Sequence, residues 1–135
     1  MRGTVLLLAG EDSYAVDTEH LRAHGLLVYE AARPDEADRI APDVVVTVLS
    51  GNSSPSVIRE LRTRVDHATS IIVVAPAASR EDRDAARGAG ADSILPMPVQ
   101  PGDVLYEVQR ALILRRSGRR LPQNREQEAG SESSG

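Results

Sequence analysis

Four runs of branched aliphatic residues divide the chain at regular intervals. They are TVLLL (4–8), LLVYE (26–30), DVVVTVL (43–49) and SIIVVA (70–75). Continuous apolar runs of this length are typical of strands that are buried on both faces, as in a parallel sheet. A shorter run, SIL (93–95), follows the turn-like GAGAD and is stopped by Pro96. The pattern therefore predicts five strands.

Capping residues and helical spacing predict helices between these strands. Asp12, as an N-cap, and Ser13 open a helix that ends at Gly25. A second helix is predicted over residues 54–65, where proline follows serine at the start. Helical spacing places three apolar residues on its inward side, Val57, Ile58 and Leu61.

Two further helices are predicted in the second half of the chain. Acidic residues follow Ser79, where the helix dipole favours negative charge, and this helix ends at Gly90. Its apolar stripe consists of Ala85, Ala86 and Ala89. After Pro101, apolar residues recur at intervals of three and four and predict a final amphipathic helix to around Leu114. The segment AARPDEADRIAP is expected to form one helical turn or two.

Strands that alternate with helices predict right-handed crossovers and a doubly wound α/β sheet. Five such units fit a flavodoxin-like (βα)5 three-layer sandwich with a parallel sheet in the order 2-1-3-4-5. We expect this domain to cover residues 1–116. Residues 117–135 lack apolar periodicity, so burial would not offset the entropy of ordering them, and we expect a disordered polar tail or linker there.

The amino-acid composition argues against several kinds of catalytic and binding site. The chain has no cysteine, and its three histidines (His20, His24 and His67) lack a metal-ligand spacing such as HExxH. All sixteen basic residues are arginine, which excludes a lysine Schiff base and a P-loop lysine. The chain has no Phe or Trp, which argues against a flavin site. We expect a cytoplasmic protein without a membrane span, a cofactor or a metal.

Three stretches of the chain resemble the receiver domains of two-component response regulators. They are TVLLLAGED after residue 3, APDVVVTVL at 41–49 and GAGADSILPMP at 88–98. The resemblance extends from residue 4 to around residue 115. It implies a CheY-like fold and a role in phosphorelay signal transduction.

The residues that carry receiver chemistry are replaced in these stretches. By the resemblance, the phosphoacceptor aspartate falls on Val48, and the lysine that contacts the phosphoryl group falls on Met97. The switch hydroxyl falls on Ala75 and the switch aromatic on Ile94. Valine offers no nucleophile, so an aspartyl phosphate would not form at this position.

The paired acids that hold magnesium in receivers are also absent. Their positions fall on Ala9 and Gly10, or on Leu8 and Ala9 if the register shifts by one residue. Glu11 and Asp12 follow and are the candidates for a remaining polar or Mg²⁺ contact, although Asp12 suits an N-cap better. We therefore predict an atypical pseudo-receiver with no catalytic residue, which acts through protein contacts without aspartyl phosphorylation.

Two alternative functions follow from the same residues. The apolar side chains at the former phosphorylation site either form a pocket for a small hydrophobic ligand or pack it closed, and we favour the closed arrangement. The cluster RRSGRR, from Arg115 to Arg120, suits contact with nucleic acid or a link to a DNA-binding output domain. Arginines also complement a helix C-terminus, and we favour that role.

Thr47 and three residues of the final helix are further candidates for a functional role. Thr47 neighbours the lost phosphoacceptor position, but strand alternation points it away from Val48. Leu105, Tyr106 and Ile113 lie on the final helix, where receivers often meet partners. A homodimer through the last strand and this helix is therefore one expectation, and a core role for these residues is the other.

Overall fold

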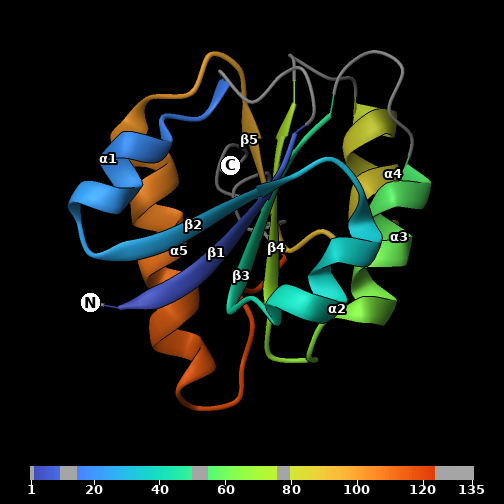
Figure 1. Cartoon of the computed structure of the whole chain (residues 1–135). Coiled ribbons are helices and arrows are strands. Elements are labelled where there is room, and N and C mark those ends of the chain that lie inside the picture. The colour runs from blue at the N-terminus through green and yellow to red at the C-terminus, as the bar shows by residue number, and fades with distance from the viewer. Residues whose placement is uncertain (1, 10–14, 50–54, 76–79, 124–135) are drawn as a thin grey trace.

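The computed structural model describes residues 2–9, 15–49, 55–75 and 80–123, which form a central sheet with helices on both sides (Figure 1). The strands are β1 (Gly3–Leu8), β2 (Leu26–Ala31), β3 (Val44–Val48), β4 (Ser70–Ala75) and β5 (Ser93–Pro96). All neighbouring pairs are parallel, and the order is β2-β1-β3-β4-β5. The five predicted strands and their order are confirmed.

The position of each strand in the sheet explains its hydrophobic pattern. Every residue of β3 and β4 is buried, because these strands have neighbours on both sides and helices on both faces. The edge strand β2 instead alternates at its start: Leu26 and Val28 are buried, whereas Leu27 and Tyr29 are exposed. Uniform runs therefore mark the central strands, and alternation marks this edge.

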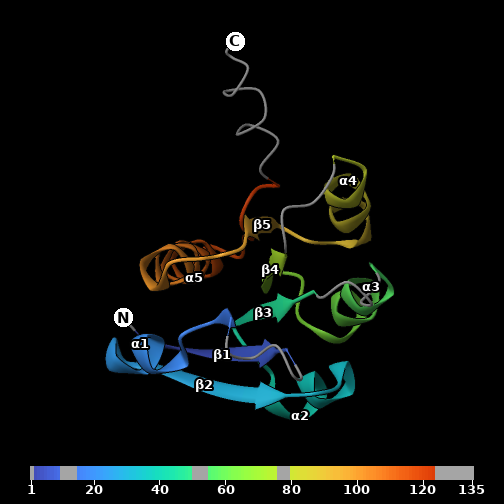
Figure 2. The ribbon, with the colours of Figure 1, turned by 90° about the horizontal axis from the view of Figure 1, so that it is seen from above.

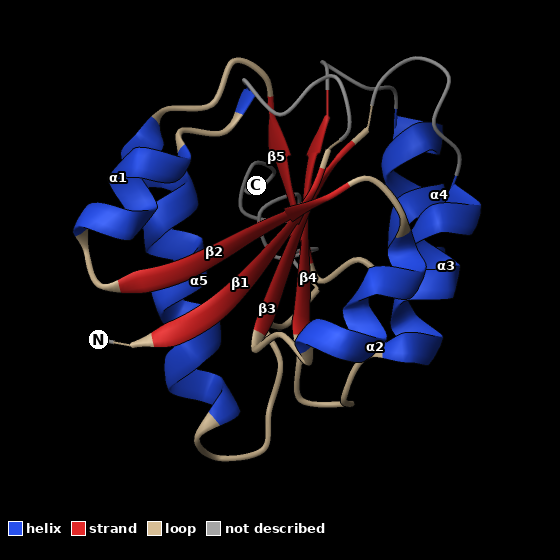
Figure 3. Cartoon of the chain, in the orientation of Figure 1, coloured by secondary structure: helices blue, strands red, loops and turns tan. Residues whose placement is uncertain are grey.

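The helices are α1 (Thr18–Ala23), α2 (Ala37–Ile40), α3 (Pro55–Arg64), α4 (Arg80–Ala89) and α5 (Pro101–Arg115), and a 3-10 turn, η2 (Pro34–Glu36), precedes α2. Figures 2 and 3 show α1 and α5 on one face of the sheet and α2, α3 and α4 on the other. The predicted three-layer arrangement is confirmed. Within the described ranges, no helix is long and apolar enough to cross a membrane.

Each face of the sheet has its own apolar core. The α1/α5 cluster joins strand residues to Leu21, Val104 and Val108. The α3/α4 cluster joins the opposite strand faces to Ile58, Leu61 and Ala86. Both cores are aliphatic, as the near absence of aromatic residues requires.

The start of α1 differs from the prediction. The helix begins at Thr18, and Asp17 caps it by accepting a hydrogen bond from the His20 amide at 3.1 Å. A start at Asp12 was wrong, and Asp12 itself lies outside the described residues. Aspartate suits either position as an N-cap. The burial of Val16 in the α1/α5 cluster accompanies the later start.

In α4, the predicted apolar stripe holds for Ala86 and Ala89, which are buried, whereas Ala85 is exposed.

The chain beyond α5 also differs from the prediction. Residues 117–123 are described, and Leu121 is only 3% exposed, so a disordered tail from residue 117 was wrong for this part. A left-handed Gly118 (φ 72°) ends the turn after α5, and the Arg119 amide donates to the Leu114 carbonyl at 3.0 Å. One apolar residue with polar neighbours therefore orders the segment. Residues 124–135 lie outside the described ranges.

Candidate functional site

The strands end together at one side of the sheet, which we call the carboxyl edge. Val48 is the last residue of β3, Ala75 is the last residue of β4, and Met97 directly follows β5. Backbone hydrogen bonds continue the pairing past the strand ends: Leu49 N donates to Val74 O at 2.9 Å, and Met97 N donates to Ala75 O at 2.8 Å. Ligands of open α/β sheets bind at this edge.

The side chains at the carboxyl edge divide between the two faces of the sheet. Val48, Ala9 and Met97 pack in the α1/α5 cluster. Leu8, Ala75 and Ile94 belong to the α3/α4 cluster. We expected Val48, Ala75, Met97 and either Leu8 or Ala9 to converge in one apolar cup. This was wrong for Ala75 and Leu8, because successive strand residues point to opposite faces, whereas Ala9 and Met97 do share the cluster of Val48. Of the two acid-pair registers, the one with Ala9 first places its residue on the Val48 side.

Val48 and Ala75 are packed rather than open to solvent, whereas Ala9, Ile94 and Met97 are only partly buried. Val48 is 5% exposed and Ala75 is 8% exposed. Thr47 is also buried and lies on the face opposite Val48, and its Oγ1 donates to the Leu8 carbonyl at 3.0 Å. That hydroxyl is thus occupied in holding β3 to β1.

Solved structures resemble this arrangement over most of the chain. A response regulator from Burkholderia multivorans is 28% identical, covering 82% of this chain and 94% of that one at a TM-score of 0.65. A CheY-like receiver domain protein from Methanospirillum hungatei JF-1 is 17% identical, covering 87% and 99% at a TM-score of 0.74. A response regulator from Thermotoga maritima is 21% identical, covering 84% and 99% at 0.68.

The chain has the fold of a response-regulator receiver domain. No family model matches the sequence, and no curated protein matches it. The likeness thus lies in the three-dimensional arrangement of a divergent receiver-like domain.

The carboxyl edge of this receiver-like domain offers apolar contacts in its described part. Val48, Ala75 and Met97 carry no oxygen ligand, nucleophile or cation. Gly10, Glu11 and Asp12 lie outside the described residues. Over the described ranges, no group of three or more His, Asp or Glu side chains is placed to hold a metal ion.

Two clefts in the described part open at the opposite side of the sheet, where the strands begin, which we call the amino edge. One, of about 460 Å³, is lined by residues that include Asp43, Asp66, His67 and Arg115. The other, of about 550 Å³, lies next to Gly3, Thr4, Gly25 and Leu27 and shares Arg2 and Asp43 with the first. Neither is lined by Val48, Ala75 or Met97.

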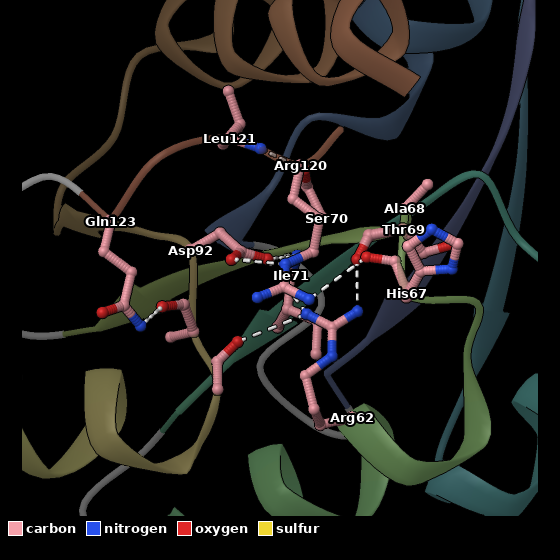
Figure 4. Close-up of polar contacts among 12 residues, drawn as sticks. Arg62, His67, Ala68, Thr69, Ser70, Ile71, Asp92, Arg120, Leu121 and Gln123 are labelled. Carbon is pink, nitrogen blue, oxygen red and sulfur yellow. Dashed lines mark hydrogen bonds and ion pairs between the residues drawn. The ribbon is translucent and has the colours of Figure 1, made fainter. Parts of the chain in front are cut away.

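The amino edge of the receiver-like domain also holds an ion-pair network around a buried aspartate (Figure 4). Asp92, which is 1% exposed, accepts from Arg62 Nη1 at 3.1 Å and from Arg120 Nε at 3.0 Å. Its other partner is the Ile71 amide at 2.9 Å. Burial raises the pKa of Asp92 in spite of these three donors, and burial also lowers the pKa of Arg62.

A second group of ion pairs lies beside this network. Arg115 Nε donates to Asp43 at 3.0 Å, and its Nη2 lies 3.5 Å from Asp66. Asp43 also accepts from the Thr4 amide at 2.9 Å. A hydrogen bond from the Ala68 amide is the main cause that lowers the pKa of Asp66, with Arg115 and His67 adding to it.

Sequence reasoning missed the role of Asp92, Arg62 and Arg120. Asp92 was noted only as part of a turn-like motif, and the two arginines come from segments 58 residues apart in the chain. The one available signal was Leu121, an isolated apolar residue between polar ones. The predicted arginine cluster is also divided: Arg115 and Arg120 form ion pairs within the domain, whereas Arg116 and Arg119 are exposed.

Proposed function

We propose that this receiver-like domain is a signalling module that acts through protein contacts without aspartyl phosphorylation. The observation that carries the proposal is a buried valine, Val48, at the position that the resemblance assigns to the phosphoacceptor. A valine side chain has no lone pair to attack a phosphoryl group. The module would be non-enzymatic and would act in the cytoplasm.

The surroundings of Val48 support the same proposal. Met97 replaces the lysine whose charge would offset a phosphoryl group, and it packs in the same cluster as Val48. Ala9 occupies an acid-pair position in that cluster and supplies no oxygen for a hard divalent cation. The residues at Val48, Met97 and Ala9 would each remove a group that phosphoryl transfer needs, and together they support a site that does not carry out this reaction.

Beryllofluoride with Mg²⁺ tests the proposal directly, since it mimics an acyl phosphate at a competent receiver site. We would follow the amide resonances of the full chain during a titration. The DrrB receiver domain, which has been solved in a BeF3-activated form, is the positive control. We expect no saturable shifts at Val48, Ala75 or Met97. Saturable shifts there would show that Glu11, Asp12 or another acid has rebuilt the site and would overturn the proposal.

A small phosphodonor supplies an independent test. We expect the intact mass of the chain to stay unchanged after incubation with acetyl phosphate and Mg²⁺, while the DrrB control gains a phosphoryl group. Stoichiometric labelling of this chain would overturn the proposal even if beryllofluoride fails to bind.

For the contact surface we propose α5. Tyr106 and Ile113 are 61% and 52% exposed there, whereas Leu105 is buried in the core. Arg110 lies over the Tyr106 ring at 5.7 Å from its centroid, which holds the aromatic side chain on the surface. Homodimerisation through β5 and α5 is one use of this surface.

Sedimentation of the Tyr106→Ala and Ile113→Ser variants over a range of concentrations tests the dimer. Leu27→Ala, which removes an exposed leucine on β2, is the matched control. We expect only the α5 variants to shift association toward monomer. Contact with nucleic acid through the exposed Arg116 and Arg119 stays a prediction, and binding that survives loss of both charges would exclude it.

A further inference from the structure

Residues 118–123 cross from the end of α5 to the outer side of β5, where Figure 2 shows them between α5 and α4. We call this segment the strap. Its first anchor is Arg120, whose Nε donates to Asp92 Oδ1 at 3.0 Å and whose Nη1 donates to the His67 carbonyl at 3.1 Å (Figure 4). The strap is thus tied to the start of β5 and to the loop before β4.

Two more residues anchor the strap. Leu121 buries its side chain in the α1/α5 cluster, and its amide donates to Ser70 Oγ at 2.8 Å. Gln123 donates from Nε2 to the carbonyls of Arg87 at 2.8 Å and Ala91 at 2.9 Å. The Arg87 carbonyl lies in the last turn of α4, where it also accepts from the Gly90 amide at 3.0 Å, and Ala91 lies just past the helix.

The receiving surface has one chemical character, because each polar atom that contacts the strap is an acceptor. We call this surface the slot; it consists of the Asp92 carboxylate, the Ser70 hydroxyl oxygen and the carbonyls of His67, Arg87 and Ala91. An occupant must therefore supply donors, a positive charge next to Asp92 and an aliphatic side chain for the core. The strap sequence Arg-Leu-Pro-Gln supplies them in that order.

The slot is positioned by contacts that do not involve the strap. Arg62 Nη1 donates to Asp92 at 3.1 Å, and Asp92 and Ile71 exchange hydrogen bonds, one from each backbone amide, both at 2.9 Å. Ser70 and Ile71 belong to β4, which pairs with β3 and β5. The acceptors would thus keep their places when the strap leaves.

The strap is held through three of its residues, Arg120, Leu121 and Gln123, and joins α5 through a hinge. Its hinge is Gly118, in the left-handed region at φ 72°, and nothing lies within 4 Å of the position where a side chain would begin there. Residues 116–120 are exposed at the level of the whole residue. The entropy lost on ordering such a segment is of the same order as the gain from one buried leucine, the Arg120–Asp92 pair and the other hydrogen bonds of the strap. Such a segment opens locally, without unfolding of the sheet.

We infer that the slot is a peptide-binding site that the chain fills with its own strap, as a releasable intramolecular latch. The ligand class is an arginine-aliphatic segment rich in donors, and release of the strap makes the slot available to such a segment of another polypeptide. The latch also fixes Gln123 beside the end of α4. This inference does not depend on the chemistry at Val48.

Complementation in trans tests the latch in the full chain. The variant Arg120→Gln/Leu121→Ala removes both main anchors, and Arg119→Gln removes a neighbouring exposed charge as a matched control. The probe is a synthetic peptide with the sequence of residues 117–123, and a peptide carrying the same two changes is its control. The readout is the amide resonances of Ile71, Ala91 and Asp92.

We expect the probe to bind the double variant saturably and to return the Ile71 and Asp92 resonances toward their wild-type positions. The control peptide should not, and the Arg119→Gln chain should respond only weakly, because its own strap competes at high effective concentration. No saturable shift in a double variant whose β3 resonances are unchanged would overturn the inference.

Hydrogen exchange in the wild-type chain keeps the inference testable if the double variant fails to fold. We expect the Leu121 amide to exchange at least roughly tenfold faster than the Val46 amide of β3, because the strap opens separately. Equal exchange rates for the two amides would mean that the strap leaves only when the whole domain unfolds, and they would overturn the latch.

Discussion

The two edges of the sheet use opposite kinds of side chain. At the carboxyl edge, Val48 and Met97 pack in an aliphatic cluster. At the amino edge, Asp92 is also buried but pairs with two arginines and a backbone amide. Open α/β sheets bind ligands at the carboxyl edge, so the edge expected to carry polar chemistry is apolar in its described part.

The two edges differ in the interaction that stabilises them: ion pairing at the amino edge and apolar burial at the carboxyl edge. The buried carboxylate of Asp92 pairs segments that are distant in the sequence: α3, the start of β5 and the chain after α5. The valine at the carboxyl edge makes no directional contact and contributes through burial alone. Changes at the amino edge should therefore act through charge, and changes at the carboxyl edge through volume and desolvation.

The largest expected effect comes from removing the centre of the charged edge. Asp92→Ala leaves Arg62, Arg120 and the Ile71 amide without their shared acceptor, and breaking a buried pair costs about 3–5 kcal/mol. Chemical denaturation measures the free energy of unfolding. Asp38→Ala, which removes an exposed partner of Arg64, is the control and should change it by no more than about 1 kcal/mol. Equal losses in the two variants would contradict the proposed difference between the edges.

Introducing a charge at the apolar edge should have the next largest effect. Val48→Asp places a carboxylate where the side chain is 5% exposed, with a cost of roughly 3 kcal/mol at neutral pH. Burial would raise the pKa of the new carboxyl, so this cost disappears below the pKa of the unfolded chain and grows as the pH rises. Val48→Asn is the uncharged control, whose cost should not vary with pH. Stability of Val48→Asp that is independent of pH would mean that water reaches the site.

The two edges should also differ in how the free energy of unfolding of their variants depends on ionic strength, although this effect is smaller. Arg115→Gln should lose about 1 kcal/mol at low salt, because Arg115 contacts Asp43 and Asp66 at a partly exposed site, and the loss should shrink as salt is added. Met97→Leu keeps a similar volume at the carboxyl edge and should cost less than about 1.5 kcal/mol at any salt concentration. A salt-dependent cost at Met97 would show that charges lie beside it.

The smallest expected effect is the dependence of stability on acid pH, because two carboxyls oppose each other. Burial raises the pKa of Asp92, so the part of the stability that depends on its protonation is present at low pH and is lost as the pH rises through that pKa, while its pairing with the arginines remains. The pKa of Asp66 is lowered by the Ala68 amide, so its contribution is lost as the pH falls. Carboxyl NMR titration should place Asp92 above the ordinary value of 3.8 and Asp66 below it. The reverse order would contradict the burial of Asp92.

The sequence predictions were accurate where a local pattern decides the structure, and they failed where contacts between distant residues decide it. The runs of β3 and β4 marked buried central strands because burial on both faces requires apolar residues at every position. The start of α1 was misplaced because Asp12 and Asp17 are equally good caps in isolation, and burial of Val16 depends on residues far away in the chain. The single apolar cup was wrong because the predicted strand ends did not give the face of each side chain.

The sequence by itself determined the five strands and the two aliphatic cores, since these follow from composition and from local period, and the strand order fits the number and alternation of the units. Only the tertiary structure decided that Arg62 and Arg120 share the buried carboxylate of Asp92 and that residues 118–123 pack on the domain. Polar partners leave no periodic signal, because an ion pair needs only proximity and complementary charge. Their meeting depends on how the sheet brings the ends of α3, β5 and α5 together.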